Sequence, residues 1–179
     1  MKILVVCGTN RDGALTRLLA KQVAGIHEQL GGDVDFLDIQ ELPADAMLPT
    51  AYKEKTPAVQ SLVDRFLASD GVVFVIPEYN GSYPGILKLF IDMLPFPEGL
   101  DSRPCAFVGI AAGQFRSLRA VEHFQQVTGY RNAYNFPRRV FIGDSFSQFD
   151  GDKLKDEDLV QRLQDQSEGF VDFVKRIKS

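Results

Sequence analysis

The residues with the clearest chemical character follow the first apolar run of the chain, in KILVVCGTNRDGALTR at positions 2–17. A thiol, Cys7, ends the run, and hydroxyl, guanidinium and glycine residues follow it. A cysteine that attacks phosphate esters needs an arginine that closes the loop and a hydroxyl that assists the leaving thiolate. Arg11 lies too early for that role, and positions 13 and 14 hold Gly and Ala. The spacing therefore argues against a cysteine phosphatase.

Other phosphate-handling motifs are also missing from this stretch. It lacks the Gly-Lys-Ser/Thr end of a nucleotide P-loop and the G-x-G-x-x-G spacing of a dinucleotide site. The apolar run ends in Cys7 rather than in an aspartate that could accept a phosphoryl group. The remaining interpretation is a loop that binds a phosphomonoester at a helix N-terminus without reacting with it.

That loop offers several hydrogen-bond donors to an anion. Gly8 and Gly13 allow a tight backbone path, and the N–H groups near residues 10–15 would point at the anion together with the positive end of the helix dipole. The side-chain donors are Thr9, Arg11 and Thr16. The alternative interpretation is an ordinary strand-to-helix connection in which Asp12 caps the helix. Both stay open at this point.

A second loop, PEYNGSYPG, is the more specific signal. Pro77 ends a strand, Asn80 and Gly81 can adopt positive φ, and Pro84 restarts a helix. A turn of this composition leaves consecutive backbone N–H groups free beside the ring of Tyr79, which suits hydrogen bonding along the edge of a planar heterocycle.

Two side chains of this second loop have more than one interpretation. Tyr79 can line the face of a bound ring or cover the core. Glu78 can act as a general acid or base, but a carboxylate on a surface turn is more often solvated or paired with a neighbouring subunit. We favour a structural role for Glu78.

Short apolar runs that alternate with helical patterns must position these loops. The runs lie at 2–7, 34–39, 71–76, 105–112 and 138–143. The helical patterns lie at about 15–30, 57–69, 84–94, 117–128 and 157–178. This alternation predicts repeated βαβ units in a three-layer α/β/α sandwich, with a flavodoxin-like five-stranded parallel sheet in the order 2-1-3-4-5. In such sheets ligands bind beyond the carboxyl ends of the strands, so we expect the site at the loops after strands 1, 3 and 4.

Length and composition limit the function classes. A chain of 179 residues without a linker-like stretch predicts one domain over residues 1–179. A net charge of −4 without a basic block argues against nucleic-acid binding, and no apolar run is long enough to span a membrane, so we expect a cytoplasmic protein. Cys7 and Cys105 form no disulfide framework, and His27 and His123 lie far from acidic clusters, so we expect no metal site.

Together, GTNRDGALTR and the later VIPEYNGSYPGILKLFID resemble the NADPH-dependent FMN reductase family, which includes quinone, azo-dye and chromate reductases. AAGQFRSLRAVEHFQQV and FPRRVFIGD match in the same order, and P-E-Y-N-x-S is the most specific element. The resemblance implies that FMN binds, takes hydride from NADPH and passes it to a quinone, free flavin or similar small acceptor by a ping-pong mechanism, with no catalytic side chain required. The implied cofactor-binding residues are Thr9, Asn10, Arg11, Gly13, Leu15 and Thr16 for the phosphate, and Pro77, Glu78, Tyr79, Asn80, Gly81, Ser82, Ala112, Gly113, Gln114 and Phe115 for the ring.

Some positions depart from the family pattern G-S-x-R-x-x-S-x-N. Ala14 replaces a serine and Thr16 replaces an asparagine. The loss of one neutral hydrogen bond costs about 0.5–1.5 kcal/mol, roughly tenfold in affinity, so we expect FMN still to bind. Gln114 and Phe115 stand where smaller residues are common and would narrow the substrate opening.

Three further questions stay open in the sequence. Arg116 and Arg119 either meet the 2′-phosphate of NADPH or are solvated helix charges. The third helix carries apolar residues on more than one side, which pack either on the core or on a second subunit. These are Tyr83, Ile86, Phe90 and Met93. The resemblance implies a homodimer or homotetramer with the flavin near the interface. The alternative function is a flavin-binding or interaction protein that has lost catalysis.

Overall fold

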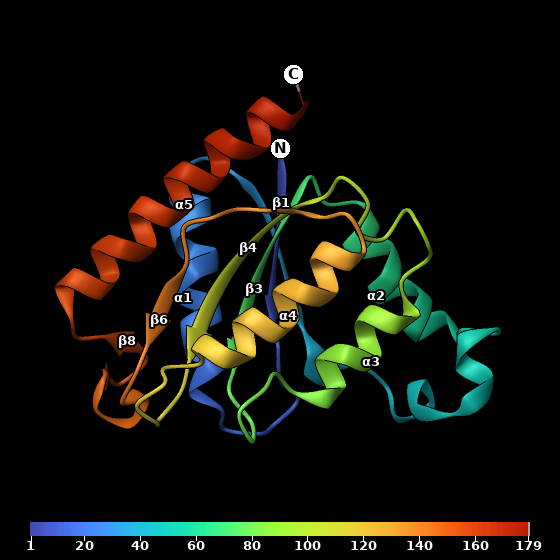
Figure 1. Ribbon diagram of the computed structural model, residues 1–179, viewed down its shortest axis with the longest axis horizontal. Helices are drawn as coiled ribbons and strands as arrows, with labels where there is room; N and C mark the ends of the chain where they lie inside the picture. Colours follow the sequence, from blue (N-terminus) through green and yellow to red (C-terminus); the bar gives the residue numbers. More distant parts are fainter. Residues whose placement is uncertain (179) are drawn as a thin grey trace.

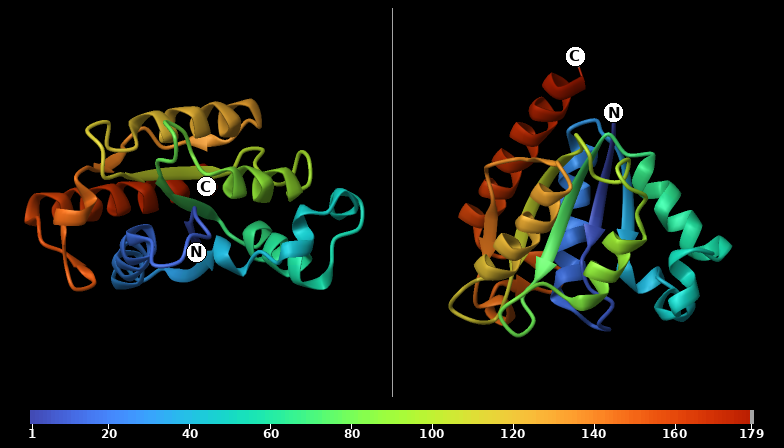
Figure 2. Two further views of the ribbon diagram at one scale, coloured as in Figure 1. Left: turned by 90° about the horizontal axis from the view of Figure 1, so that it is seen from below. Right: turned by 45° about the vertical axis from the view of Figure 1, so that its right-hand side comes forward.

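The computed structural model describes residues 1–178 and shows a parallel sheet with helices on both faces (Figure 1, Figure 2). The strands are β1 (Lys2–Cys7), β2 (Asp33–Asp38), β3 (Gly71–Pro77), β4 (Pro104–Ile110), β5 (Tyr134–Asn135) and β6 (Val140–Ile142). They pair in the order β2-β1-β3-β4-β5, and β6 pairs with the other end of β4. All these pairings are parallel. The predicted flavodoxin-like α/β fold is therefore confirmed.

Two hydrophobic clusters fill the space between the sheet and its helices. The helices are α1 (Leu15–Gln29), α2 (Pro57–Leu67), α3 (Gly85–Met93), α4 (Leu118–Tyr130) and α5 (Glu157–Lys178). One cluster joins α1 and α5 to the sheet, and the other joins α2, α3 and α4 to its opposite face. Because helices cover both faces, β3 and β4 are buried along their whole length, which explains their continuous apolar sequence.

Aromatic packing holds α4 and α3 against the sheet. The rings of Phe74 and Phe107 stack with centroids 6.1 Å apart, and Phe124 of α4 meets Phe74 edge-on at 4.8 Å. Phe90 and Met93 of α3 are also fully buried in this cluster. Of the apolar residues on the third predicted helix, Phe90 and Met93 therefore pack in the core of their own chain and not against a second subunit.

The strand predicted at 138–143 corresponds to β6, and β5 is an additional short strand that the sequence did not predict. β5 pairs with the start of β4 at Pro104 and Cys105, whereas β6 pairs with its end. Pro137 lies between the two short strands and has no N–H to donate to the ladder. The chain therefore leaves the sheet at Pro137 and returns at β6.

Short elements fill the remaining connections. The 3₁₀ helices η1 (Ile39–Glu41), η2 (Ala44–Met47) and η3 (Pro49–Tyr52) follow β2, and η4 (Ser145–Ser147) and the hairpin of β7 (Phe149–Asp150) and β8 (Lys153–Leu154) follow β6. Within residues 1–178, no helix combines the length and apolar character that a membrane crossing requires.

Candidate functional site

The loops after β1, β3, β4 and β6 enclose a cavity of about 240 Å³ at the carboxyl edge of the sheet. We call it the strand-end cavity. It is lined by residues 11–16, 77–79, 110–112 and 145–146. The parallel register places Pro77 beside Ile110, so these loops start at the same edge. The position agrees with the loops expected from the sequence.

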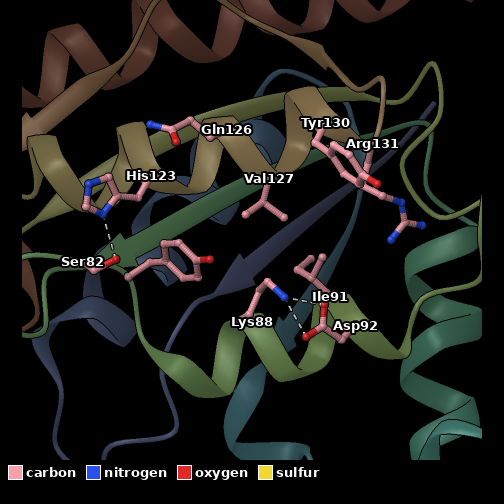
Figure 3. Close-up of a pocket in the computed structure, with 10 residues that line it drawn as sticks. Ser82, Lys88, Ile91, Asp92, His123, Gln126, Val127, Tyr130 and Arg131 are labelled. Atoms are coloured by element: carbon pink, nitrogen blue, oxygen red, sulfur yellow. Dashed lines mark hydrogen bonds and ion pairs between the residues drawn. The ribbon is translucent and has the colours of Figure 1, made fainter.

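A larger space of about 540 Å³ lies between α3 and α4, and we call it the α3/α4 groove (Figure 3). Its lining residues are Ser82, Tyr83, Lys88, Ile91, Asp92, His123, Gln126, Val127, Tyr130 and Arg131. Only Ser82 of the predicted site lies on this groove, where its Oγ is 3.0 Å from Nδ1 of His123. Size alone would select the groove, but the predicted phosphate loop lines only the strand-end cavity.

The first loop leaves the N-terminus of α1 uncapped at this cavity. The N-cap residue is Ala14, which has no side-chain acceptor, and the first N–H groups of any α-helix lack intrahelical partners. The Asp12 carboxylate accepts a hydrogen bond from the N–H of Gly13 at 3.0 Å instead. The alternative in which Asp12 caps α1 is therefore wrong, because the helix starts later than that interpretation requires.

Thr9 and Tyr79 join the first loop to the second. Thr9 is fully buried, and its Oγ1 lies 2.6 Å from the hydroxyl of Tyr79. The same Oγ1 accepts a hydrogen bond from the N–H of Arg11 at 3.1 Å. Close packing extends to Gly8, where a Cβ would lie 2.8 Å from the carbonyl oxygen of Val75. Thr9 thus holds the two loops together and does not line the cavity itself.

The second loop closes into a tight turn between Tyr79 and Ser82. Their N–H groups donate to each other's carbonyl oxygens at 2.8 and 3.1 Å. The central residues, Asn80 and Gly81, have φ of 52° and 77°, as a two-residue hairpin of the Asn-Gly type requires. The N–H of Glu78 donates to Ile110. Of the N–H groups between Glu78 and Ser82, those of Asn80 and Gly81 are therefore the ones left without a backbone partner in the described structure.

Glu78 is more enclosed than a surface turn would predict. Its side chain is half-buried on the cavity wall, and its Oε2 is shielded from solvent without a hydrogen-bond partner in the described structure. One of the two carboxylate oxygens is therefore not solvated, in contrast to the solvated surface carboxylate that the sequence favoured, and the alternative of a pairing with a neighbouring subunit stays a prediction.

The third loop only partly reaches the cavity. Ala112 lines it, whereas Gly113 and Gln114 are exposed and lie outside its lining. Phe115 is also outside and 45% exposed, with the guanidinium carbon of Arg119 4.4 Å from its ring centroid. Asn10 of the first loop also lies outside the cavity lining, as do Asn80 and Gly81 at the tip of the second loop.

Four lining residues were not anticipated from the sequence: Ile110, Ala111, Ser145 and Phe146. The N–H of Ser145 donates to the carbonyl of Ala111 at 3.2 Å, which brings η4 against the end of β4. Phe146 is 82% exposed at the cavity rim. The available signal was topological, because η4 follows the carboxyl end of a parallel strand as the other site loops do.

Burial makes the two thiols chemically inert. It raises the pKa of Cys7 to about 12 and that of Cys105 to about 12. Cys7 is therefore a neutral thiol and a poor nucleophile, in agreement with the sequence argument. Across residues 1–178, no three His, Cys, Asp or Glu side chains gather in an arrangement that could hold a metal ion.

The positive charge on the cavity lining comes from Arg11, and the carboxylates of Asp12 and Glu78 also lie on the lining. The nearby Arg17 instead forms an ion pair with Asp38, and this hydrogen bond raises the pKa of Arg17 above its ordinary value. Arg11 lines the cavity and pairs with no carboxylate in the part of the chain that the structure describes. An anion at the first loop would therefore meet an uncapped helix end and an available guanidinium.

A parallel sheet in the order 2-1-3-4-5, with a cavity beyond the carboxyl ends of its central strands, defines a flavodoxin-like α/β protein. The model of the NADPH-dependent FMN reductase family matches residues 1–148. The chain belongs to this family.

Individual relatives agree with that membership. The NADPH-dependent FMN reductase ArsH of Rhizobium meliloti is 28% identical, over 96% of this chain and 71% of that protein. The NAD(P)H-dependent FMN reductase PA1204 of Pseudomonas aeruginosa is 26% identical, over 99% of this chain and 97% of that protein. The NAD(P)H:(acceptor) oxidoreductase FerB of Paracoccus denitrificans superposes with a TM-score of 0.81 at 23% identity, over 98% and 97% of the two chains, which shows a shared fold.

The family membership identifies the protein as an NAD(P)H-dependent oxidoreductase that uses FMN. This confirms the enzyme class and cofactors predicted from the sequence. The individual binding residues and the electron acceptor are a separate question, which the geometry of the strand-end cavity addresses.

Proposed function

We propose that FMN binds in the strand-end cavity and that the enzyme transfers electrons from NADPH to a quinone, a free flavin or a similar small acceptor. The observation that carries this proposal is the uncapped N-terminus of α1, which opens onto the cavity beside Arg11. Backbone N–H groups, a helix dipole and a guanidinium together suit a phosphate monoester. One flavin-binding domain, residues 1–179, carries the activity.

The first loop holds the phosphate in this proposal. The donors are the N–H groups at the start of α1, the side chain of Arg11 and the hydroxyl of Thr16, which lines the cavity. Thr9 acts through the hydrogen bond of its hydroxyl to Tyr79. The other proposed residues of this loop are Asn10, Gly13 and Leu15.

The second and third loops hold the ring. Pro77, Glu78, Tyr79 and Ala112 line the cavity from the ends of the neighbouring strands β3 and β4. Asn80 and Gly81 supply the remaining N–H donors of the second loop. The residues proposed at the outer edge are Ser82, Gly113, Gln114 and Phe115, which border the cavity without lining it.

When bound, FMN supplies the redox chemistry, taking hydride from NADPH and giving electrons to the acceptor. Since no acid or base is needed, the residues of the chain bind, orient and exclude water. NADPH and the acceptor use the same open face in turn, so the kinetics are ping-pong. The proposed partner of the 2′-phosphate of NADPH is Arg119, supported by its contact with the exposed ring of Phe115 in the third loop.

The active form is a homodimer, or a homotetramer built from it, with a second copy of this chain in the α3/α4 groove. Two large aromatic side chains support this, because Tyr130 on the groove is 83% exposed and nearby Phe96 is 71% exposed. Lys88 and Asp92 form an exposed ion pair on α3 (Figure 3), and opposite charges on one face can pair with the same face of a second copy. Sedimentation of the wild type and Tyr130→Lys tests this: the variant should be monomeric.

A visible absorption spectrum of the purified protein, before and after NADPH, tests the main proposal. The spectrum should show the absorption of bound flavin, which should bleach when NADPH is added and recover when a quinone is added. In a separate steady-state experiment, double-reciprocal plots of the rate at several quinone concentrations should be parallel lines. A protein that binds FMN but does not bleach would be a flavin-binding protein without catalysis. One that binds no FMN would contradict the proposed site.

A further inference from the structure

Three arginine side chains gather around a small pocket at the start of β6, on the edge of the sheet. The pocket has a volume of about 210 Å³ and is lined by Arg138, Arg139, Val140, Arg162 and Asp165. We call it the edge pocket. It shares no lining residue with the strand-end cavity, which lies beyond the carboxyl ends of the strands.

Helix α5 fixes the position of Arg138 and brings a second guanidinium beside it. Gln166 is 2% exposed, and its Nε2 donates to the carbonyl oxygens of Phe107 and Arg138 at 2.9 and 2.8 Å. Nη1 of Arg138 in turn donates to the carbonyl oxygen of Asp165 at 3.3 Å. Arg162 precedes Gln166 by four residues, so the two side chains lie on the same face of α5.

Arg139 supplies the third guanidinium, and contacts with α4 hold it in place. Its Nη1 donates to Oε1 of Gln125 at 3.1 Å and lies 3.6 Å from Oε1 of Glu122. Its guanidinium carbon lies 5.4 Å from the ring centroid of Phe141. The three arginines thus reach one pocket from the segment before β6 and from α5, and two of them are held by the fold.

Most N–H donors of these guanidinium groups have no acceptor in the protein. Each group carries five N–H donors, but within residues 1–178 the three side chains form only two hydrogen bonds. The carboxylate on the lining, that of Asp165, accepts at Oδ1 from Nε2 of Gln161 and pairs with none of these arginines. Three like charges therefore share one small pocket, and a bound anion would relieve their repulsion.

We propose that the edge pocket binds a phosphate group, either free inorganic phosphate or the phosphate of a small phosphorylated metabolite. The planar guanidinium group matches pairs of phosphate oxygens, and hydrogen bonds between two ions are stronger than those between neutral groups. A dianion with several acceptor oxygens suits three guanidinium groups better than a carboxylate, which is a monoanion with two oxygens. Because Arg138 and Arg162 are exposed, a substituent on the phosphate can extend into solvent.

Isothermal titration calorimetry with inorganic phosphate, at constant ionic strength, tests this site. The first loop is the other place where a phosphate could bind, so the titration uses flavin-loaded protein freed of unbound FMN, and also Arg11→Ala. Both proteins should show saturable binding at one site per chain, and acetate should bind at least tenfold more weakly. Glycerol 2-phosphate distinguishes the two sources: tighter binding than inorganic phosphate indicates a metabolite ester, and weaker binding indicates the free ion.

Variants on α5 locate the binding. Arg162→Ala should weaken phosphate binding about tenfold, as the loss of one charged donor predicts. Arg162→Lys should lose less, because it keeps the charge but not the paired donors. Arg176→Ala changes an exposed arginine of the same helix outside the pocket lining and should bind phosphate as the wild type does. Phosphate should also raise the melting temperature of the wild type more than that of Arg162→Ala, since it binds only the folded chain.

Four results would overturn the proposal. The absence of saturable binding would leave the arginines as solvated charges that keep the exposed sheet edge from pairing with other chains. Binding that disappears in flavin-loaded protein or in Arg11→Ala would place the phosphate at the first loop. Equal weakening in Arg162→Ala and Arg176→Ala would indicate attraction to overall charge. A change of sedimentation in Arg162→Ala with unchanged phosphate affinity would assign the arginines to carboxylates of a second copy.

Discussion

Acidification should destabilise this protein through one buried histidine. His27 of α1 is 1% exposed, and neither ring nitrogen has a hydrogen-bond partner in the described structure. Its nearest aromatic neighbour is Phe170 of α5, in an edge-on contact with centroids 6.3 Å apart. Burial lowers the pKa of His27 from 6.5 to about 4. Protonation of the folded protein would place an unpaired charge in this packed interface.

The sign and size follow from proton binding in the two states. Between about pH 6.5 and pH 4 the unfolded chain holds a proton on His27 and the folded chain does not, so the free energy of unfolding falls as the pH falls. The difference between the two pKa values limits this effect to about 3 kcal/mol. At about pH 5 the loss already reaches about 2 kcal/mol, a large share of the stability of a typical domain.

Denaturant unfolding of the wild type and His27→Leu at about pH 7 and pH 5 measures this contribution. The wild type should lose about 2 kcal/mol more than the variant over this interval, because the variant has no proton to bind. His123→Asn, which alters an exposed histidine on α4, should behave as the wild type. Equal losses in the wild type and His27→Leu would refute the reasoning, because the shared carboxylates would then explain the whole effect.

The remaining predictions concern the first loop. Arg11→Ala should weaken FMN binding about tenfold but leave riboflavin binding unchanged, because riboflavin lacks the phosphate. Arg11→Lys should lose less FMN affinity than Arg11→Ala. If Arg11→Ala lost equal affinity for FMN and for riboflavin, a contact between Arg11 and the phosphate would be excluded. Tyr79→Phe should lower the free energy of unfolding by about 1 kcal/mol, and a cycle with Thr9→Val should show that the two losses are not additive. Gly8→Ala should lower the free energy of unfolding by about 1–3 kcal/mol, since the new Cβ would meet the backbone of Val75. An unchanged melting temperature in this variant would contradict the close approach of Gly8 to Val75.

The sequence predicted the elements whose patterns are set by burial. The run at 71–76 corresponds to β3 because a strand covered on both faces must be apolar throughout. The stripe at 157–178 gives the observed bounds of α5, because an amphipathic helix shows the same period along its length. The run at 138–143 corresponds to β6, whereas β5 could not be predicted, since its pairing with the start of β4 depends on distant residues rather than on local pattern.

The site was predictable to the extent that topology determines it. The loops after β1 and β3 were found because parallel strands end at one edge. Phe146 was missed because its place at the cavity depends on a long-range hydrogen bond between Ser145 and Ala111. Gln114 was named from the motif, but it is exposed and lies outside the cavity lining. Its contact with FMN stays a prediction.

The start of α1 has no side-chain cap, and neither have the starts of α2, α3 and α4, whereas α5 has one. At α5, the carboxylate of Asp156 accepts a hydrogen bond from the N–H of Leu159 at 3.1 Å, as a normal N-cap does. At α1, Ala14 leaves the first turn without such an acceptor, a loss of about 1 kcal/mol relative to a capping residue. A bound phosphate would supply the missing acceptors, and because it binds only the folded chain it would also stabilise the fold. The start of α1 differs from the other uncapped starts in lining the strand-end cavity together with Arg11, and this combination is the argument that an anion belongs at this end of the helix.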